Sequence, residues 1–374
     1  MLTLLLLVIF AALVFEFING FHDTANSIAT VVATKVLSPG KAVMLAAFMN
    51  LLGAFFGTAV AKTISSGLID AEVVQVTSQV ILCALMGGIT WNLITWWLGL
   101  PSSSSHALIG GLCGAALSAA NLDWNALIWT QVSPEGWTHN KGLLWKVVIP
   151  MVTSPLAGFI LGVAILAALY ALISLVRKLP GAISRLSRPR WVNAFFGKAQ
   201  VLSAAYMGFA HGSNDAQKTM GIIALALFGA QAAGTLDTLP PWLAFLHPSS
   251  ADSAHIDTWI IVTCAIVMAA GTASGGWRII KTLGHKMVKL QPIDGFAAET
   301  ASATILVTAA HLGMPVSTTH SISTAIMGVG FGKNPRALKI TVIERIIWAW
   351  ILTIPAAGGV AYLLYKLVVL LGWA

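Results

Sequence analysis

Long apolar runs dominate this 374-residue chain, and the first of them, Leu2–Ile18, leads directly into the polar stretch Asn19–Asn26, NGFHDTAN. A helix needs about 20 apolar residues to cross a bilayer, so this stretch falls where a membrane helix would still lie inside the hydrocarbon. Polar side chains are costly at that depth and are typical of functional sites. The feature predicts a membrane protein whose site is built from intramembrane polar groups.

The composition favours the same class. Hydrophobic residues make up 57% of the chain and charged residues 9%, whereas about a quarter of the residues in a soluble domain are charged. The opening run has no basic segment before it and no small-residue cleavage site after it, which favours a first membrane segment over a signal peptide. The three cysteines lie in apolar runs without CxxC or CxxH spacing, so no disulfide framework, metal site or cofactor is predicted.

The distribution of charge predicts how the chain is oriented. A net charge of +8 could indicate a nucleic-acid partner, but the basic residues cluster in a few loops, mainly at residues 177–200, 278–289 and 333–339. Loops rich in Lys and Arg face the cytoplasm. The segment Gly234–Thr258 has aspartates but no Lys or Arg, which suits the outer face. We expect a multi-pass protein of the inner (plasma) membrane, in contact with the lipid bilayer, with both termini outside and no nucleic-acid partner.

The second half of the chain repeats features of the first. The stretch His211–Lys218, HGSNDAQK, is related to NGFHDTAN and aligns Asp23 with Asp215 and Asn26 with Lys218. The segments LPSSSSH (residues 100–106) and MPVSTTH (residues 314–320) form a second pair, and a GTA triplet begins 44 residues before the proline of each. These matches predict an internal duplication.

Several apolar runs are too short to cross a membrane alone. A run of ten to fourteen residues covers about half of the ~30 Å hydrocarbon core, so we expect helices broken at the two polar stretches, and re-entrant hairpins. The predicted fold is an all-α polytopic membrane protein with two inverted-topology repeats, residues 1–176 and 201–374, joined by a basic cytoplasmic linker, residues 177–200. Inverted repeats with broken helices indicate a secondary transporter.

Hydroxyl side chains follow the proline at each predicted hairpin tip. The candidate ligands there are Ser103, Ser104, Ser105, Ser317, Thr318 and Thr319. Unpaired backbone N–H groups at a helix start and the positive end of the helix dipole attract anions. One such tip is explained equally well by ordinary helix capping after a proline, but a matched pair favours a site for a tetrahedral oxyanion.

The two aligned aspartates predict a coupling ion, because a carboxylate beside a bound anion needs a cation or a proton between them. Asp23 and Asn26 offer oxygen ligands that suit Na⁺. Lys218 supplies an ammonium that could replace Na⁺, pair with Asp215 and attract the anion. This asymmetry favours proton coupling over sodium coupling. The alternative is a buried ion pair that only holds the helices together.

Other titratable residues in apolar surroundings are weaker candidates. Glu16 and Glu299 could carry the transported proton; the alternative is that they are plain buried or snorkelling carboxylates. His106 and His320 follow the hydroxyl runs at matching positions, where a hydrogen bond to a site residue is expected rather than direct ligation.

Four motifs, NGFHDTANSIATVV, HGSNDAQKTMG, PSSSSH and PVSTTH, resemble the signatures of the inorganic phosphate transporter (PiT) family, in order and over essentially the whole chain. The resemblance implies an inverted-repeat fold, commonly a homodimer, with phosphate held between the hairpin tips and the two broken helices. Sodium-coupled members have Asn at the position of Lys218. The QK version resembles the bacterial low-affinity, proton-coupled branch, which implies that phosphate could travel as a neutral complex with a divalent metal.

These observations predict a proton-coupled importer of inorganic phosphate. Alternatives on the same scaffold are sodium-coupled phosphate transport and sulfate transport. A membrane-embedded phosphatase using His22, Asp23 and His211 is disfavoured, because there is no HExxH and no arginine in the motifs to stabilise a phosphoryl transition state. No enzymatic activity is expected.

Overall fold

The computed structural model describes residues 1–70, 72–180, 183–237, 239–250 and 255–373, and the regular elements named in these ranges are all helical. The α-helices are α1 (Leu2–Ala33), α2 (Pro39–Ala54), α3 (Ala59–Ser66), α4 (Ser78–Leu98), α5 (Ser104–Ala119), α6 (Ile149–Lys178), α7 (Pro189–Ala232), α8 (Thr258–Ser274), α9 (Trp277–Lys281), α10 (Pro292–His311), α11 (Thr318–Lys333) and α12 (Ile340–Leu370). Short 3₁₀ or π segments are η1 (Trp124–Ala126), η2 (Trp137–His139), η3 (Leu144–Val148), η4 (Ile183–Ser187), η5 (Pro241–Leu246), η6 (Thr282–Lys286) and η7 (Pro335–Ala337).

Long apolar helices support a multi-pass membrane protein. Among the described residues, α1, α4, the continuous segment Leu144–Lys178 and α12 are each long and apolar enough to cross a bilayer. Two bent helix pairs, α2 with α3 and α8 with α9, pass the same test together, with bends of 71° and 58°. The described chain therefore has four candidate spans, or up to six if each bent pair is one span.

The prediction that the two polar stretches break their helices is wrong. α1 continues through Asn19–Asn26, and α7 continues through His211–Lys218. The polar side chains find partners on neighbouring elements, so the backbone keeps its hydrogen bonds and no free carbonyl is needed. The breaks occur instead between α2 and α3 and between α8 and α9, where Gly57 (φ 92°) and Gly275 (φ 76°) adopt backbone angles that favour glycine.

Two close helix crossings have matching geometry in the two halves of the chain. A Cβ atom on Gly53 would lie 2.1 Å from the carbonyl oxygen of Phe209, and one on Gly271 would lie 2.2 Å from that of Phe17. Phe17 and Phe209 each stand six residues before the aspartate of their polar stretch. Gly53 is therefore the spatial counterpart of Gly271. The equal spacing of the GTA triplets does not align equivalent positions, because Gly57 lies four residues beyond Gly53, at the helix break.

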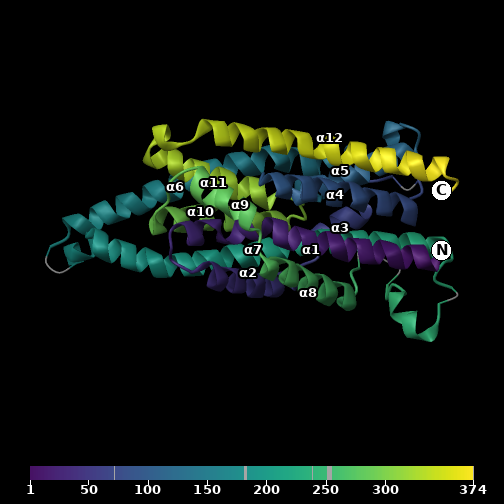
Figure 1. Cartoon of the computed structure of the whole chain (residues 1–374), viewed down its shortest axis with the longest axis horizontal. Coiled ribbons are helices and arrows are strands. Elements are labelled where there is room, and N and C mark those ends of the chain that lie inside the picture. The colour runs from purple at the N-terminus through teal and green to yellow at the C-terminus, as the bar shows by residue number, and fades with distance from the viewer. Residues whose placement is uncertain (71, 181–182, 238, 251–254, 374) are drawn as a thin grey trace.

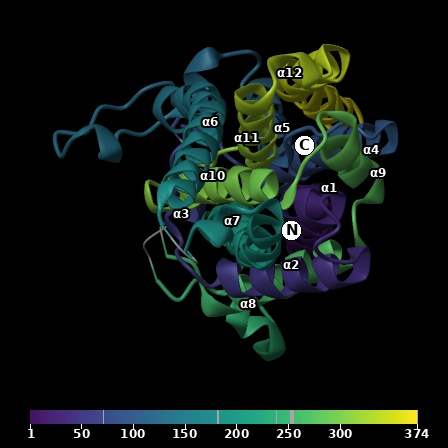
Figure 2. The same cartoon turned by 90° about the vertical axis from the view of Figure 1, so that its left-hand side faces the viewer.

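The two polar helices lie at the centre of the bundle. α1 and α7 pack against each other and run in opposite directions along the long axis (Figure 1). Helices α2 and α8 cover them on one side, and α4, α5, α10 and α11 on the other (Figure 2). Each polar helix thus has one face against a bent helix and the other against the hairpins.

The hairpin formed by α4 and α5 and the one formed by α10 and α11 lie toward opposite ends of the molecule (Figure 1). Both chain termini lie at one end, and the C-terminal end of α6 and the N-terminal end of α7 lie at the other. The predicted linker, residues 177–200, is largely helical there, since α6 runs to Lys178 and α7 begins at Pro189. The polar segments of α1 and α7 and both hairpin tips consequently meet near the middle.

Candidate functional site

Each hairpin tip ends in a capped helix start. The Oγ of Ser103 accepts a hydrogen bond from the backbone N–H of His106 at 3.1 Å, at the start of α5. The Oγ of Ser317 does the same for His320 at 3.2 Å, at the start of α11. A serine N-cap satisfies one of the four N–H groups that a helix start leaves unpaired. The others, with the positive dipole end, favour negative charge at both tips.

The two tips are in contact. The hydroxyl of Ser105 donates to the carbonyl oxygen of Val316 at 3.3 Å, and the rings of His106 and His320 lie 4.8 Å apart, centroid to centroid. The Oγ of Ser104 is buried and has no hydrogen-bond partner among the described residues. We expected the rings of His106 and His320 to form hydrogen bonds with site residues. Nδ1 of His106 and Nε2 of His320 do not: both atoms are buried and have no hydrogen-bond partner among the described residues. These rings pack at the interface between the hairpins.

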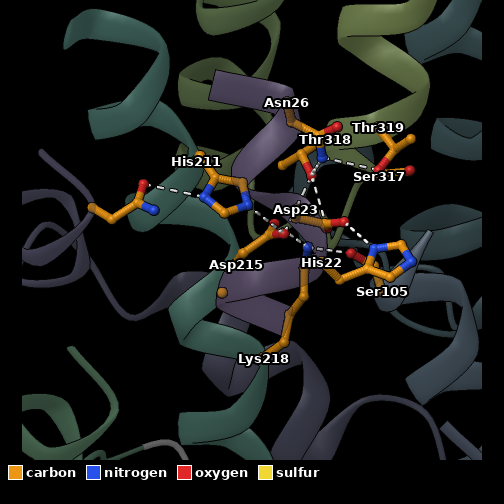
Figure 3. A network of polar contacts seen from close by, with 12 residues as sticks. His22, Asp23, Asn26, Ser105, His211, Asp215, Lys218, Ser317, Thr318 and Thr319 are labelled. Carbon is orange, nitrogen blue, oxygen red and sulfur yellow. Dashed lines mark hydrogen bonds and ion pairs between the residues drawn. The ribbon is translucent and has the colours of Figure 1, made fainter. Parts of the chain in front are cut away.

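On α1, three polar residues face this meeting point (Figure 3). The Nδ1 of His22 lies 2.7 Å from Oδ1 of Asp23. One turn later, Nδ2 of Asn26 donates to the hydroxyls of Thr318 and Thr319, at 3.1 and 2.9 Å. Asn26 therefore fixes the second hairpin tip to α1, while its own carbonyl oxygen is buried without a partner among the described residues.

On α7, the equivalent positions carry a charged pair. The Nζ of Lys218 lies 2.5 Å from Oδ1 of Asp215. It also donates to the hydroxyl of Ser105 and, at 3.0 Å, to the carbonyl oxygen of Val316. Lys218 is 2% exposed and Asp215 is fully buried, so each charge depends on the other for stabilisation. One ammonium thus touches α7 and both hairpin tips.

A threonine hydroxyl joins the two carboxylates. The Oγ1 of Thr318 lies 3.4 Å from Oδ2 of Asp23 and 3.3 Å from Oδ2 of Asp215. Ligand atoms of Asp23, Asp215 and His211 lie within 4.8 Å of one another, close enough to hold a cation, although no metal site is predicted from the sequence. The structure therefore brings together residues of α1, α7 and both tips that are almost 300 positions apart in the chain.

The two candidate proton carriers lie outside this cluster, on opposite sides of it. Glu16 stands seven residues, about 10 Å of helix, before Asp23 and accepts a hydrogen bond from Thr219 at 2.5 Å. Glu299 accepts hydrogen bonds from Ser203 and from Thr30, which stands seven residues after Asp23. Both carboxylates are fully buried. They are not part of the central cluster but flank it along the axis of α1.

Asn50 is a site residue that sequence reasoning missed. It lies fully buried on α2, where its Oδ1 is 3.1 Å from Nδ1 of His211 and its Nδ2 donates to the hydroxyl of Thr272 at 2.8 Å. In the sequence, the only indication of its role is that it is a single carboxamide inside the apolar run Ala42–Ala61. Its partner is far away in the sequence, so the pattern alone did not indicate the contact.

Comparisons with known proteins agree on one family. The profile of the "Phosphate transporter family" matches residues 19–361. "Probable low-affinity inorganic phosphate transporter" proteins of Mycobacterium bovis and Bacillus subtilis are 42% and 40% identical, covering 99% and 98% of this chain and 78% and 99% of their own. A relative with the same description in Rhizobium meliloti is 43% identical over 97% of this chain and 96% of its own.

The fold is also similar to a solved structure. "The sodium-dependent phosphate transporter" superposes with a TM-score of 0.77 at 24% identity, covering 98% of this chain and 99% of that one. At this identity the likeness concerns the fold alone. The names of the relatives indicate a transporter rather than an enzyme.

Proposed function

Because this chain belongs to the phosphate transporter family, we propose that it imports inorganic phosphate by symport with protons and binds the anion at the central cluster. The proposed phosphate ligands lie at the two tips and on the two polar helices. They are Asp23, Asn26, Ser103, Ser104, Ser105, Asp215, Lys218, Ser317, Thr318 and Thr319.

The position of the Lys218 ammonium is the observation that carries this proposal. Its contacts with Ser105 and Val316 place a positive charge where the two capped helix starts meet. A phosphate at this point would find the ammonium, the tip hydroxyls and the unpaired N–H groups together. Such convergent donors recognise a tetrahedral oxyanion.

Proton coupling is supported by the same residue. In the polar stretch of α7, the Lys218 ammonium pairs with Asp215. With an asparagine at that position, a bound Na⁺ would instead have to neutralise the carboxylate. A protein that carries a fixed cation there needs a different mobile ion. Glu16 and Glu299, buried on either side of the cluster, are the proposed proton carriers. Sodium coupling at Asp23 and Asn26 is the alternative.

We further propose that residues 1–176 and 201–374 are inverted repeats and that the two hairpins enter the membrane from opposite faces. The helix contacts support this exchange of roles: α1 packs on α8 as α7 packs on α2, and α6 packs on α11 as α12 packs on α5. Two such halves could alternate access to the shared site. A bacterial inner-membrane location with both termini outside, and a homodimer, belong to the same proposal.

Uptake of labelled phosphate into proteoliposomes, with pH and Na⁺ gradients imposed separately, tests the proposal. An inward proton gradient is expected to drive uptake without Na⁺. Uptake that follows Na⁺ and ignores pH would overturn proton coupling. Competition by sulfate would indicate the other oxyanion, and release of phosphate from an ester by the pure protein would favour the phosphatase instead.

A further inference from the structure

The turn of the first hairpin is held by residues of the second half of the chain. The carbonyl oxygen of Gly99, just after α4, accepts a hydrogen bond from the hydroxyl of Thr282 at 2.9 Å. The carbonyl oxygen of Trp97 accepts one from the guanidinium of Arg278 at 2.6 Å, and this guanidinium also lies 5.1 Å from the centre of the Trp96 ring. A helix leaves its last carbonyls unpaired, and a cation is favourable at that end because of the helix dipole. The segment α9–η6 therefore fixes the end of α4.

The second hairpin has the same two kinds of contact, supplied by the first half. The carbonyl oxygen of Gly313, just after α10, accepts a hydrogen bond from the hydroxyl of Thr63 on α3 at 2.7 Å. The carbonyl oxygen of Leu312 accepts one from the Lys146 ammonium at 2.9 Å. Lys146 lies on η3, is 7% exposed and also donates to the carbonyl oxygen of Thr138 at 3.0 Å. One threonine and one cation thus hold each hairpin turn.

The two sets of contacts involve matching parts of the halves. Gly99 and Gly313 each stand two residues before the proline of their tip, and their φ angles are 65° and 62°. The segments that contact them, α3 and α9, are the second parts of the two bent helix pairs. In both cases the bent pair of one half contacts the hairpin of the other. This agreement indicates a shared role for the two sets of contacts.

The contacts lie on opposite sides of the central cluster. A Cβ atom on Gly221 of α7 would lie 2.6 Å from the carbonyl oxygen of Ala61 on α3, and one on Gly284 of η6 would lie 2.6 Å from that of Ala29 on α1. Gly221 and Ala29 each stand six residues after the central aspartate of their own helix. Because α1 and α7 run in opposite directions, α3 and α9–η6 pack beyond the cluster toward opposite ends of the molecule (Figure 1).

We propose that these contacts are the two gates of the transporter: an α3 gate, made by Thr63 and Lys146, and an α9 gate, made by Arg278 and Thr282. Each gate closes the central cluster toward one face of the membrane by holding the hairpin tip of the other half. Both gates are closed in this structure, where the two central aspartates are at most 2% exposed. Release of one tip opens the site to one face only. The use of these contacts as gates rests on the proposed function.

Accessibility of a cysteine at the site measures which gate is open. Ser104→Cys places this reporter at the first tip, where the hydroxyl has no hydrogen-bond partner among the described residues, in a chain whose three native cysteines are replaced with alanine. A membrane-impermeant methanethiosulfonate is applied to right-side-out and to inside-out membrane vesicles. Lys146→Gln should raise the labelling rate from one face about tenfold, and Arg278→Gln should do so from the opposite face, because each removes a hydrogen bond made by a charged donor.

Matched controls separate the gates from a general effect of charge. Lys141→Gln changes an exposed lysine close to Lys146, and Lys281→Gln changes one on the same helix as Arg278. Both should leave the two labelling rates unchanged. The conservative variants Lys146→Arg and Arg278→Lys keep a cation at each hairpin turn and should restore most of the closed state. A residue that served only stability would instead raise labelling from both faces alike.

Two smaller substitutions keep the test decisive if a cation variant fails to fold. Thr63→Val and Thr282→Val each remove one hydroxyl hydrogen bond and should shift labelling in the same directions as Lys146→Gln and Arg278→Gln, about threefold to tenfold. Labelling that is unchanged, or that rises from the same face in variants of both gates, would overturn the gates and leave phosphate transport standing. Labelling from opposite faces in a protein that takes up no phosphate would overturn the transport proposal and leave the gates standing.

Discussion

The centres of α1 and α7 carry the same carboxylate at equivalent positions and a different residue three positions later. Asp23 is followed by Asn26, which donates two hydrogen bonds to one hairpin tip. Asp215 is followed by Lys218, which pairs with it at 2.5 Å and touches both tips. The two polar helices supply the frame of the site, and Lys218 on α7 supplies a fixed positive charge that α1 lacks at the aligned position, Asn26.

The two carboxylates, Asp23 and Asp215, also differ in the basic side chain that each one contacts. Asp23 faces an imidazole, His22, which can be neutral, while Asp215 faces a lysine ammonium. A buried ammonium that loses its counter-ion is strongly destabilising, whereas a neutral imidazole remains a hydrogen-bond donor to an amide. The halves should therefore respond unequally to the same substitution.

Asp215→Asn should have the largest effect. It leaves the Lys218 ammonium buried and unpaired, at a cost of about 3–5 kcal/mol in the free energy of unfolding, and phosphate uptake should be lost. Asp23→Asn should lower the thermal unfolding midpoint in detergent much less. The double variant Asp215→Asn with Lys218→Met removes both charges and should recover most of the lost stability. Equal destabilisation by the two single variants would contradict the pairing described for each half.

Lys218→Asn gives α7 the residue that α1 carries at the aligned position, Asn26, and should have the next largest effect. Proton-driven uptake is expected to fall about tenfold or more, equivalent to 1.4 kcal/mol, and Na⁺ should now stimulate uptake because it can replace the missing ammonium beside Asp215. Lys366→Asn is the control: this lysine is only partly buried on α12, and its ammonium donates to Oδ1 of Asn121, away from the central cluster. Unchanged proton-driven uptake in Lys218→Asn would reduce the lysine to a structural partner.

Substitutions at the two close helix crossings should have smaller effects on stability, and the effects should be similar in the two halves. Gly53→Ala and Gly271→Ala each place a Cβ atom against a backbone carbonyl and should cost about 1–3 kcal/mol of stability. Gly40→Ala, on the same helix as Gly53, meets nothing within 4 Å and should be neutral or slightly stabilising. Thermal unfolding of the three variants measures this. If Gly53→Ala behaved like Gly40→Ala, the close crossing of α2 and α7 would be wrong.

The residue types of the site could be predicted from the sequence, because polar groups are conspicuous in apolar runs. The all-helical membrane class and the phosphate transporter family are confirmed. The assignment of ligands and coupling ions remains a prediction, although the structure places the tips, Asp23 and Asp215 together.

The helix breaks could not be located by the same reasoning. Polarity shows that a side chain needs a partner, but it does not show whether the partner is a side chain or a freed backbone group. In α1 and α7 the partners include side chains of other helices, such as Thr318 for Asn26, and backbone carbonyls of other elements, such as that of Val316 for Lys218, so the polar stretches remain helical. The contact of Asn50 with His211 could not be predicted either, because the two residues are 161 positions apart in the sequence.

The helix caps at the two tips should give the smallest and most nearly equal effects. Ser103→Ala and Ser317→Ala each remove one hydrogen bond to a backbone N–H, at 3.1 and 3.2 Å, and each should cost about 1 kcal/mol of stability. Because the two caps are equivalent in geometry, thermal unfolding should show similar shifts, and replacing each serine with Asn or Asp should restore most of the loss. A pronounced difference in unfolding midpoint would show that the two tips, like α1 and α7, are inequivalent. In that case the asymmetry of the site would extend beyond Lys218 to the hairpins that it joins.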